Sequence, residues 1–317
     1  MKVYIKNRKR QKSEFQFYMH QFVESAIKQN IEFKSDYKIN KITKLLTKII
    51  IKLPCLHFKK KAIIITSQGW SLAYNAFPYF SYEIIPMLWD VWPKTWESLY
   101  DSLYKLRCKI VFVTVRSMAE KLRADLGINA YWIPEGIDIN DYDKGAELKL
   151  RNLDVYELGR QLPKYHAILK TVLSKQQLIC NEYDSNGSLL KLAYPTAEDL
   201  LRNLNKTKII ISFPKIDTHP QNVGDLETLT QRYWEAMLSG CLIVGRAPKE
   251  LIDFIGYNPV VDIDWNMPDK QILDILNNIE DFQPLVDKNY KTAREKASWD
   301  LRIQKIKSIL YEHGYSI

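Results

Sequence analysis

The sequence predicts an α/β protein built from two doubly wound, Rossmann-like domains that face a central cleft. From residue 61 onward, short apolar runs alternate with stretches of helical periodicity, an order typical of βαβ units and a parallel sheet. The alternation begins again near residue 153. A chain of 317 residues also exceeds what one hydrophobic core usually holds, so two domains are expected.

The first domain is expected to span 1–140. Its predicted strands are short apolar runs at 2–6, 61–66, 84–89, 109–114 and 130–133. Helices are expected near 13–29, 95–106 and 116–126. In the first of these helices one face is apolar, made of Phe15, Tyr18, Met19, Phe22, Ala26 and Ile27.

The second domain is expected over 150–290. Its predicted strands are 153–158, 177–181, 208–213, 241–245 and 260–263, with helices near 164–174, 196–206 and 228–239 and two more towards the C-terminus. The segment 134–150 is rich in Gly, Asp and Asn, as a linker would be. Residues 291–317 are expected to form a C-terminal helix that packs back on the first domain.

Charge is unevenly distributed along the chain. Residues 1–61 carry 16 Lys and Arg against 4 Asp and Glu, whereas the whole chain is +9, so the remainder is close to neutral. A basic segment of this kind indicates an anionic partner such as a membrane surface, a lipid phosphate or a nucleic acid. A nucleic acid is the weakest of these, because interleaved aromatic residues on a basic face are absent there. The four cysteines show no CxxC spacing, and the N-terminus lacks the apolar region of a signal peptide, so a cytoplasmic protein is expected.

Within this segment, residues 38–53 form an amphipathic pattern. Apolar and basic positions fall on opposite helical faces, namely Ile39, Ile42, Leu46, Ile49 and Leu53 against Lys41, Lys44, Lys48 and Lys52. Two interpretations remain open. The helix lies on an anionic membrane through residues 38–61, at the inner face of the cell membrane, or it is a surface helix whose apolar stripe packs on the sheet.

The segment 208–250 carries the most chemical information. Glu227 and Glu235 are separated by seven residues, so one carboxylate falls at a loop–helix junction and the other on the helix body. The helix N-terminus between them offers free backbone N–H groups, which suit a diphosphate. Carboxylates accept hydrogen bonds from sugar hydroxyls. The donor site is therefore expected in residues 205–250.

This segment resembles the E-x7-E region of retaining GT-B glycosyltransferases of family 4, also called group 1. Four segments match in order: LWDVWP at 88–93, IPEGIDINDY at 133–142, LGR at 158–160, and the run from Glu227 to Gly245. The resemblance implies the GT-B fold and transfer of a sugar from a nucleotide-sugar donor to an acceptor hydroxyl on a glycan or lipid-linked saccharide, as in polysaccharide biosynthesis. It also implies retention of configuration and no catalytic metal.

The resemblance also implies individual roles. Glu235 would bind the ribose hydroxyls, Glu227 the transferred sugar, and the backbone amides of Thr228 and Leu229 the diphosphate. Arg160 would pair with the diphosphate and stabilise the leaving group, for which a guanidinium is well shaped.

Several positions depart from the family pattern. The second diphosphate-binding cation has no clean match, and Lys164, His166 and Lys215 are the candidates. The family His before Asp90 is Trp89, and the Asn of its N-G-V-D turn is Glu135.

Weaker predictions concern other polar residues near expected strand ends. Asp90 would orient the acceptor or a donor hydroxyl, or cap a turn. His219 would reach the sugar or face solvent, and Arg232 would pair with one of the two glutamates. Ser67, Gln68 and Gly69 would line the acceptor side or form a plain turn.

Other chemistries are disfavoured. The sequence has no G-x-S-x-G, Walker A, HExxH or G-x-G-x-x-G motif, and its five histidines show no metal-ligand spacing. We therefore expect a glycosyltransferase without metal or other cofactor. The alternatives are a nucleotide-sugar epimerase on the same fold and a non-catalytic protein that binds a sugar nucleotide or a nucleic acid.

Overall fold

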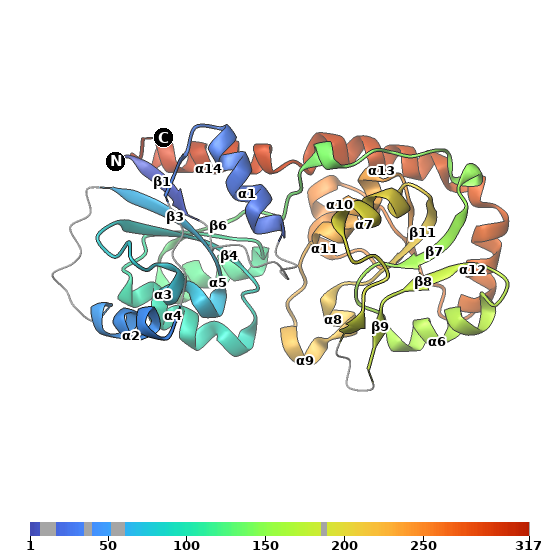
Figure 1. The fold of residues 1–317 in the computed structure, drawn as a ribbon, viewed down its shortest axis with the longest axis horizontal. Coiled ribbons are helices and arrows are strands. Elements are labelled where there is room, and N and C mark those ends of the chain that lie inside the picture. The colour runs from blue at the N-terminus through green and yellow to red at the C-terminus, as the bar shows by residue number, and fades with distance from the viewer. Residues whose placement is uncertain (7–16, 35–39, 52–60, 185–188, 317) are drawn as a thin grey trace. The chain divides into compact units, whose positions relative to one another are not determined.

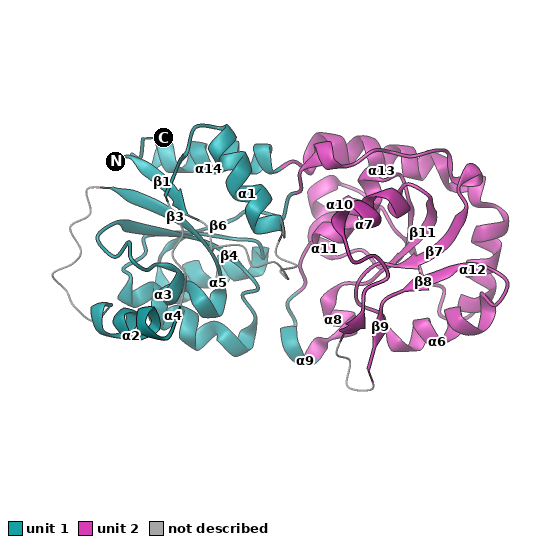
Figure 2. Ribbon diagram, viewed as in Figure 1, with its two compact units in different colours: residues 1–136, 221–226, 299–317 teal, residues 137–220, 227–298 magenta. Residues whose placement is uncertain are grey.

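The computed structural model describes residues 1–6, 17–34, 40–51, 61–184 and 189–316 (Figure 1). The chain divides into two compact units (Figure 2). Unit 1 comprises Met1–Gly136, Gln221–Leu226 and Trp299–Ile317, and unit 2 comprises Ile137–Pro220 and Glu227–Ser298. Each unit contains a parallel sheet with helices on both faces, so the predicted α/β class with two Rossmann-like units is confirmed.

The sheet of unit 1 has the strand order β2-β1-β3-β4-β5-β6, and all its pairs are parallel. Its elements are β1 (Val3–Lys6), α1 (Phe17–Lys28), β2 (Glu32–Phe33), α2 (Lys41–Ile50), β3 (Ala62–Gln68), α3 (Leu72–Asn75), β4 (Glu83–Trp89), α4 (Trp96–Lys105), β5 (Ile110–Val113), α5 (Arg116–Leu126), β6 (Asn129–Trp132) and α14 (Trp299–Glu312). Helix α5 ends at Gly127, which adopts the left-handed conformation (φ 63°) that glycine tolerates best.

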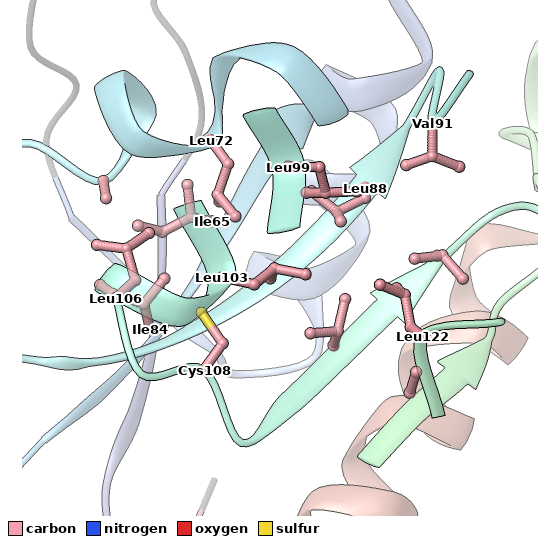
Figure 3. Close-up of a cluster of buried hydrophobic side chains, with 14 of the residues drawn as sticks. Ile65, Leu72, Ile84, Leu88, Val91, Leu99, Leu103, Leu106, Cys108 and Leu122 are labelled. Carbon is pink, nitrogen blue, oxygen red and sulfur yellow. The ribbon is translucent and has the colours of Figure 1, made fainter. Parts of the chain in front are cut away.

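Two apolar layers cover this sheet. On one face, side chains of β3 and β4 such as Ile65 and Leu88 pack with Leu99 and Leu103 of α4 (Figure 3). On the other face α1 and the C-terminal helix α14 pack together, with the rings of Phe22 and Trp299 5.4 Å apart. The last helix of the chain is therefore part of unit 1.

The sheet of unit 2 has the order β13-β12-β11-β7-β8, again entirely parallel, and β9 and β10 form a separate antiparallel pair. The elements are β7 (Leu153–Glu157), α6 (Pro163–Val172), β8 (Leu178–Cys180), β9 (Glu182–Tyr183), β10 (Leu189–Lys191), α7 (Ala197–Leu204), β11 (Thr207–Ser212), α8 (Lys215–Thr218), α10 (Gln231–Leu238), β12 (Leu242–Gly245), α11 (Lys249–Ile255), β13 (Val261–Asp262), α12 (Pro268–Asn277) and α13 (Gln283–Lys296). Between α8 and α10 lies α9 (Pro220–Val223), which spans the boundary of the two units.

The carboxyl ends of three neighbouring strands meet at one edge of this sheet. Ser212 of β11 is in register with Gly245 of β12, and Glu157 of β7 with Ile211. The loops that follow these strands therefore begin side by side, at the edge where ligands bind in open α/β sheets.

Some boundaries differ from the sequence prediction. Helix α10 begins at Gln231 rather than near 228, because Thr230 is its N-cap and has an extended backbone. The predicted boundary at 291 falls inside α13, and the second unit continues to Ser298. Of the predicted helix 38–53 the structure has α2 over Lys41–Ile50, and residues 13–16, 38–39 and 52–53 of the predicted helices lie outside the described residues. Among the helices that the structure describes, none has the length and apolar character needed to cross a bilayer.

Candidate anion-binding site

Positively charged side chains gather at the carboxyl edge of the unit 2 sheet. Gly159 and Arg160 follow β7, and Lys215 begins the short helix α8 after β11. Two nitrogens of Arg160, Nε and Nη2, are shielded from solvent. The sheet order brings these two loops together although they are more than 50 residues apart in the sequence.

His219 lies among these cations. Burial lowers the pKa of its imidazole, and the charges of Arg160, Lys215 and Arg232 lower it further. The imidazole Nδ1 is buried and has no hydrogen-bond partner among the described residues. Three cations that act on one partly buried imidazole make an environment that favours an anion.

Arg232 is held close to the backbone of the β7 loop. A Cβ atom placed on Gly159 would lie 2.6 Å from Nη2 of Arg232 and 2.9 Å from its Cζ, so a larger residue here would displace the guanidinium. Gly159 has a φ of +82°, which also favours glycine. Within the described chain, Nη1 of Arg232 is buried without a hydrogen-bond partner, and no ion pair joins Arg232 to Glu227 or Glu235. The predicted pairing with a glutamate is thus not a direct ion pair among the described residues, although the charge of Arg232 acts to lower the pKa of Glu235.

Glu235 points from the body of α10 and is largely buried. The hydroxyl of Tyr142 donates to its Oε1 at 3.3 Å. Burial raises the pKa of Glu235, while the charge of Arg232 and the Tyr142 hydrogen bond act in the opposite direction. The carboxylate thus keeps acceptor capacity beyond this one long hydrogen bond.

Glu227 is held by a second arginine that the sequence reasoning missed. Its Oε1 lies 2.5 Å from Nη1 of Arg246, and its Oε2 accepts the backbone N–H of Lys249 at 2.7 Å. Arg246 also forms a two-point pair with Asp217, at 2.7 and 2.8 Å. These carboxylates raise the pKa of Arg246 despite the opposing effect of burial. Only the fold brings the three residues together.

The two predicted backbone donors precede α10. The N–H of Leu229 donates to Oε2 of Glu250 at 3.0 Å, so it is occupied in this structure. Thr228 is buried, and its hydroxyl donates to the carbonyl of Leu229. The N-terminus of α10 itself begins after Thr230, whose side chain makes no capping hydrogen bond and whose hydroxyl has no partner among the described residues.

The other cation candidates have different partners. The Lys164 ammonium lies 4.7 Å from the centre of the Trp265 ring, and Nδ1 of His166 contacts a carboxylate oxygen of Glu157. Glu157, His166 and Cys180 offer ligand atoms within 4.8 Å of one another, the group closest to a metal site in the described chain. Because His166 is hydrogen-bonded directly to the buried Glu157, this contact within the protein accounts for the group.

A surface pocket of about 620 Å³ opens at the ends of β11 and β12. Apolar and aromatic side chains such as Phe213 and Trp265 share its lining with Asp217 and Arg246. The pocket therefore joins the Glu227–Arg246 pair to a surface that suits a small organic ligand.

The predicted acceptor-side residues lie at the carboxyl ends of β3 and β4 in unit 1. Nε2 of Gln68 donates to Oδ2 of Asp90 at 2.8 Å, and Asp90 has a positive φ of 50°. Ser67 is buried and shares hydrogen bonds with Ser71 and Asn75, so it belongs to an internal polar network.

Two further positions at this edge are closely packed. Gly69 lies against Val91, since a Cβ there would come within 3.3 Å of its side chain. Trp89, which replaces the family His, is buried between Phe22 and Trp299 and cannot take the place of an imidazole at a site.

Comparison with known proteins identifies the fold. No protein-family model and no curated protein matches the sequence. Among solved structures, HepE from Anabaena, in complex with UDP and glucose, matches with a TM-score of 0.63 and 12% identity over 98% of this chain and 100% of HepE. Sucrose-phosphate synthase from Thermosynechococcus elongatus gives a TM-score of 0.60 and 12% identity over 98% of both chains. TarM gives 0.59 and 16% identity over 87% of this chain, which spans 59% of TarM.

These likenesses confirm the two-domain GT-B fold that glycosyltransferases share. At such low identity they establish the fold and leave the activity to be argued from the site.

Proposed function

We propose that this chain is a glycosyltransferase that moves a sugar from a nucleoside diphosphate sugar to an acceptor hydroxyl. The observation that carries the proposal is the group of cations around His219 near the carboxyl edge of the unit 2 sheet, of which Arg232 also acts on the carboxylate of Glu235. Cations bind a diphosphate, and a carboxylate accepts hydrogen bonds from ribose hydroxyls. The similar fold of HepE, solved with UDP-glucose, supports this class of donor.

Each charged group has a task in this reaction. Arg160 and Lys215 neutralise the diphosphate, whose negative charge grows as the bond to the anomeric carbon breaks. Glu235 accepts hydrogen bonds from the ribose. Glu227, fixed by Arg246 and the Lys249 N–H, accepts from hydroxyls of the transferred sugar.

The acceptor oxygen forms the new bond to the anomeric carbon, its proton leaves with the departing diphosphate, and configuration is retained, as the family resemblance implies. These side chains supply the charge neutralisation, so the proposal includes no metal.

The donor assignment is tested by binding. UDP-, GDP- and ADP-linked sugars are added to the full chain in a thermal-shift assay, because a ligand that binds only the folded state raises Tm. The expected result is a rise with one of them and its loss in Arg160→Met. Arg202→Met is the matched control, since Arg202 is an exposed arginine of the same unit paired with Glu198. If none of the three donors raises Tm, the proposal fails; conversion of the donor to an epimer without transfer would favour the epimerase.

We further propose that α2 docks the enzyme on an anionic membrane that carries a lipid-linked acceptor. Four of the five apolar residues of α2 face solvent: Ile42 is 68% exposed, Leu45 60%, Leu46 39% and Ile49 52%, whereas Ile50 packs against the core. Only Thr47 is buried in this helix. The alternative from the sequence, an apolar stripe packed on the sheet, does not fit these exposures. Lysines interleaved with exposed apolar side chains match the chemistry of a bilayer interface with anionic headgroups.

Vesicle co-sedimentation tests the docking helix. Each lysine near an anionic leaflet contributes about 1 kcal/mol, so changing Lys41, Lys44 and Lys48 to Glu should weaken binding to phosphatidylglycerol vesicles by more than about 100-fold. Ile42→Ser with Ile49→Ser should also weaken it. Leu190→Ser is the control, because Leu190 is equally exposed (67%) but lies in unit 2. Unchanged sedimentation of the lysine variant would refute the docking role.

A further inference from the structure

Arg232, which lies against Gly159, makes no ion pair with a carboxylate among the described residues. Arg232 is the second residue of α10, and its guanidinium packs on the Cα of Gly159, next to Arg160 in the chain. Its Nη1 is buried without a hydrogen-bond partner among the residues described. Glu227 is bonded to Arg246, and Glu235, on which the charge of Arg232 acts, makes no ion pair with it among the described residues.

A buried arginine donor without a partner lowers the stability of the folded protein unless another group accepts its hydrogen bond. A buried donor without a partner loses its hydration, and positive charges crowded in a medium of low dielectric repel one another. Arg160, Lys215 and Arg232 all act electrostatically on His219, so the three charges share one small region. In the same region Glu235 supplies one negative charge. The three cations that act on His219 outnumber this carboxylate, so their region favours an anionic ligand.

A second buried donor without a partner lies close to Arg232 in the chain. The hydroxyl of Thr230, the N-cap of α10, is also buried without a partner in the described chain, one residue before the helix starts. The helix N-terminus adds a positive dipole end to the same place. Two adjacent anionic groups would pair with the positive charges of Arg160, Lys215 and Arg232 and with the helix N-terminus.

We propose that Arg232 is the second diphosphate-binding cation of this enzyme, and that Gly159 is the positioning residue that lets its guanidinium reach the ligand. The inference rests on the proposed donor site and adds to it the residue that the sequence pattern lacks. The candidates from the sequence are accounted for: Lys164 lies over Trp265 and His166 is paired with Glu157, whereas Lys215 stands beside Arg232 as a third charge.

Isothermal titration with two probes, UDP and inorganic pyrophosphate, tests the assignment on the full chain. Pyrophosphate has no base or ribose, so it reports on the diphosphate contacts alone. Loss of a charge-assisted contact should weaken both ligands about 10- to 100-fold in Arg232→Met. Arg232→Lys should recover part of the loss. Arg202→Met, which removes an exposed arginine of the same unit, should bind like the wild type.

Gly159→Ala provides an independent variant that keeps every charge. Its Cβ would displace the guanidinium of Arg232, so affinity for both probes should fall. If Gly159 acts through Arg232, the double variant with Arg232→Met should bind no worse than Arg232→Met alone. Additive losses would overturn the positioning role. Circular dichroism and thermal unfolding confirm that each variant is folded.

The outcomes separate this inference from the proposed function. If the wild type binds UDP or pyrophosphate and Arg232→Met binds them equally well, Arg232 is not a diphosphate ligand, while the donor site stands. If Arg232→Met weakens UDP but leaves pyrophosphate unchanged, Arg232 acts through Glu235 and the ribose, and the inference is overturned. If the wild type binds neither probe nor any of the three nucleotide sugars, both proposals fail.

Discussion

Glu235 should contribute to donor binding while it lowers the stability of the empty protein. Its carboxylate is largely buried on α10, and Tyr142 is its one hydrogen-bond donor within the described residues, at 3.3 Å. Hydrogen bonds to a charged group contribute about 1.5–3 kcal/mol. Glu235→Gln keeps the volume and removes the charge, so affinity for a nucleotide-sugar donor should fall roughly 10- to 150-fold.

The stability of the same variant should change in the opposite direction. Burial raises the pKa of Glu235, so the folded state disfavours its charged form. A group whose pKa is raised on folding contributes stability below its unfolded pKa, and that stability is lost as the pH rises through the folded pKa. At pH 7 the carboxylate is therefore a net cost, and Glu235→Gln should unfold at an equal or higher urea concentration.

Two measurements on one pair of variants show whether Glu235 binds the donor or stabilises the fold. Urea unfolding at pH 5 and pH 7 and donor titration at pH 7 are carried out on Glu235→Gln and on Glu198→Gln, an exposed glutamate of the same unit. The control should leave both quantities unchanged. Donor affinity equal to that of the wild type, or a loss of stability of about 2 kcal/mol or more, would show that Glu235 is a structural residue and refute the reasoning.

Two other predictions concern Arg151 and His219. Arg151 donates to the carbonyl oxygens of Lys144, Ala146, Thr207 and Ser239 at 2.6–2.9 Å, so Arg151→Met should cost about 3–5 kcal/mol in urea unfolding; a loss below about 1 kcal/mol would contradict this. Because the pKa of His219 is lowered by burial and by neighbouring cations, a bound diphosphate should raise it, and UDP-glucose should bind more tightly at pH 6 than at pH 8. His219→Asn should abolish that difference; if it persists, His219 is not the titrating group.

The fold was predictable because its strands carry their own signal. Strands of a parallel sheet are covered on both faces, so they are continuous apolar runs such as Ile63–Ile65 and Ile209–Ile211, and the structure has β3 and β11 there. The β9–β10 pair was not predicted because it is short and exposed. Leu190, for example, is 67% exposed, so the pair leaves no burial pattern in the sequence. The start of α10 was predicted a few residues too early. Its N-cap, Thr230, makes no side-chain capping hydrogen bond, so the cap leaves little trace in the sequence.

Within the candidate site, spacing along one element could be predicted and contact between elements could not. Glu227 and Glu235 were identified because they flank one helix start. The partners of Glu227 were not, because Arg246 follows a different strand and Asp217 a different loop. The approach of Arg232 to Gly159 joins positions 73 residues apart, and only the order of β7 and β11 in the sheet brings their loops together.

Three arginines of unit 2 show how bonding separates structural residues from ligand-binding ones. Arg151 donates to carbonyl oxygens and Arg246 pairs with two carboxylates, so both guanidinium groups have their partners within the protein. Nη1 of Arg232 has no such partner in the described chain, and Glu235 is held by one long hydrogen bond. The stability of the fold does not explain why one helix carries both a guanidinium and a carboxylate whose hydrogen-bonding capacity is partly unused. Both are explained by a ligand that carries phosphate at one end and hydroxyls at the other, since the groups that cost stability in the empty site are those that gain most when it binds.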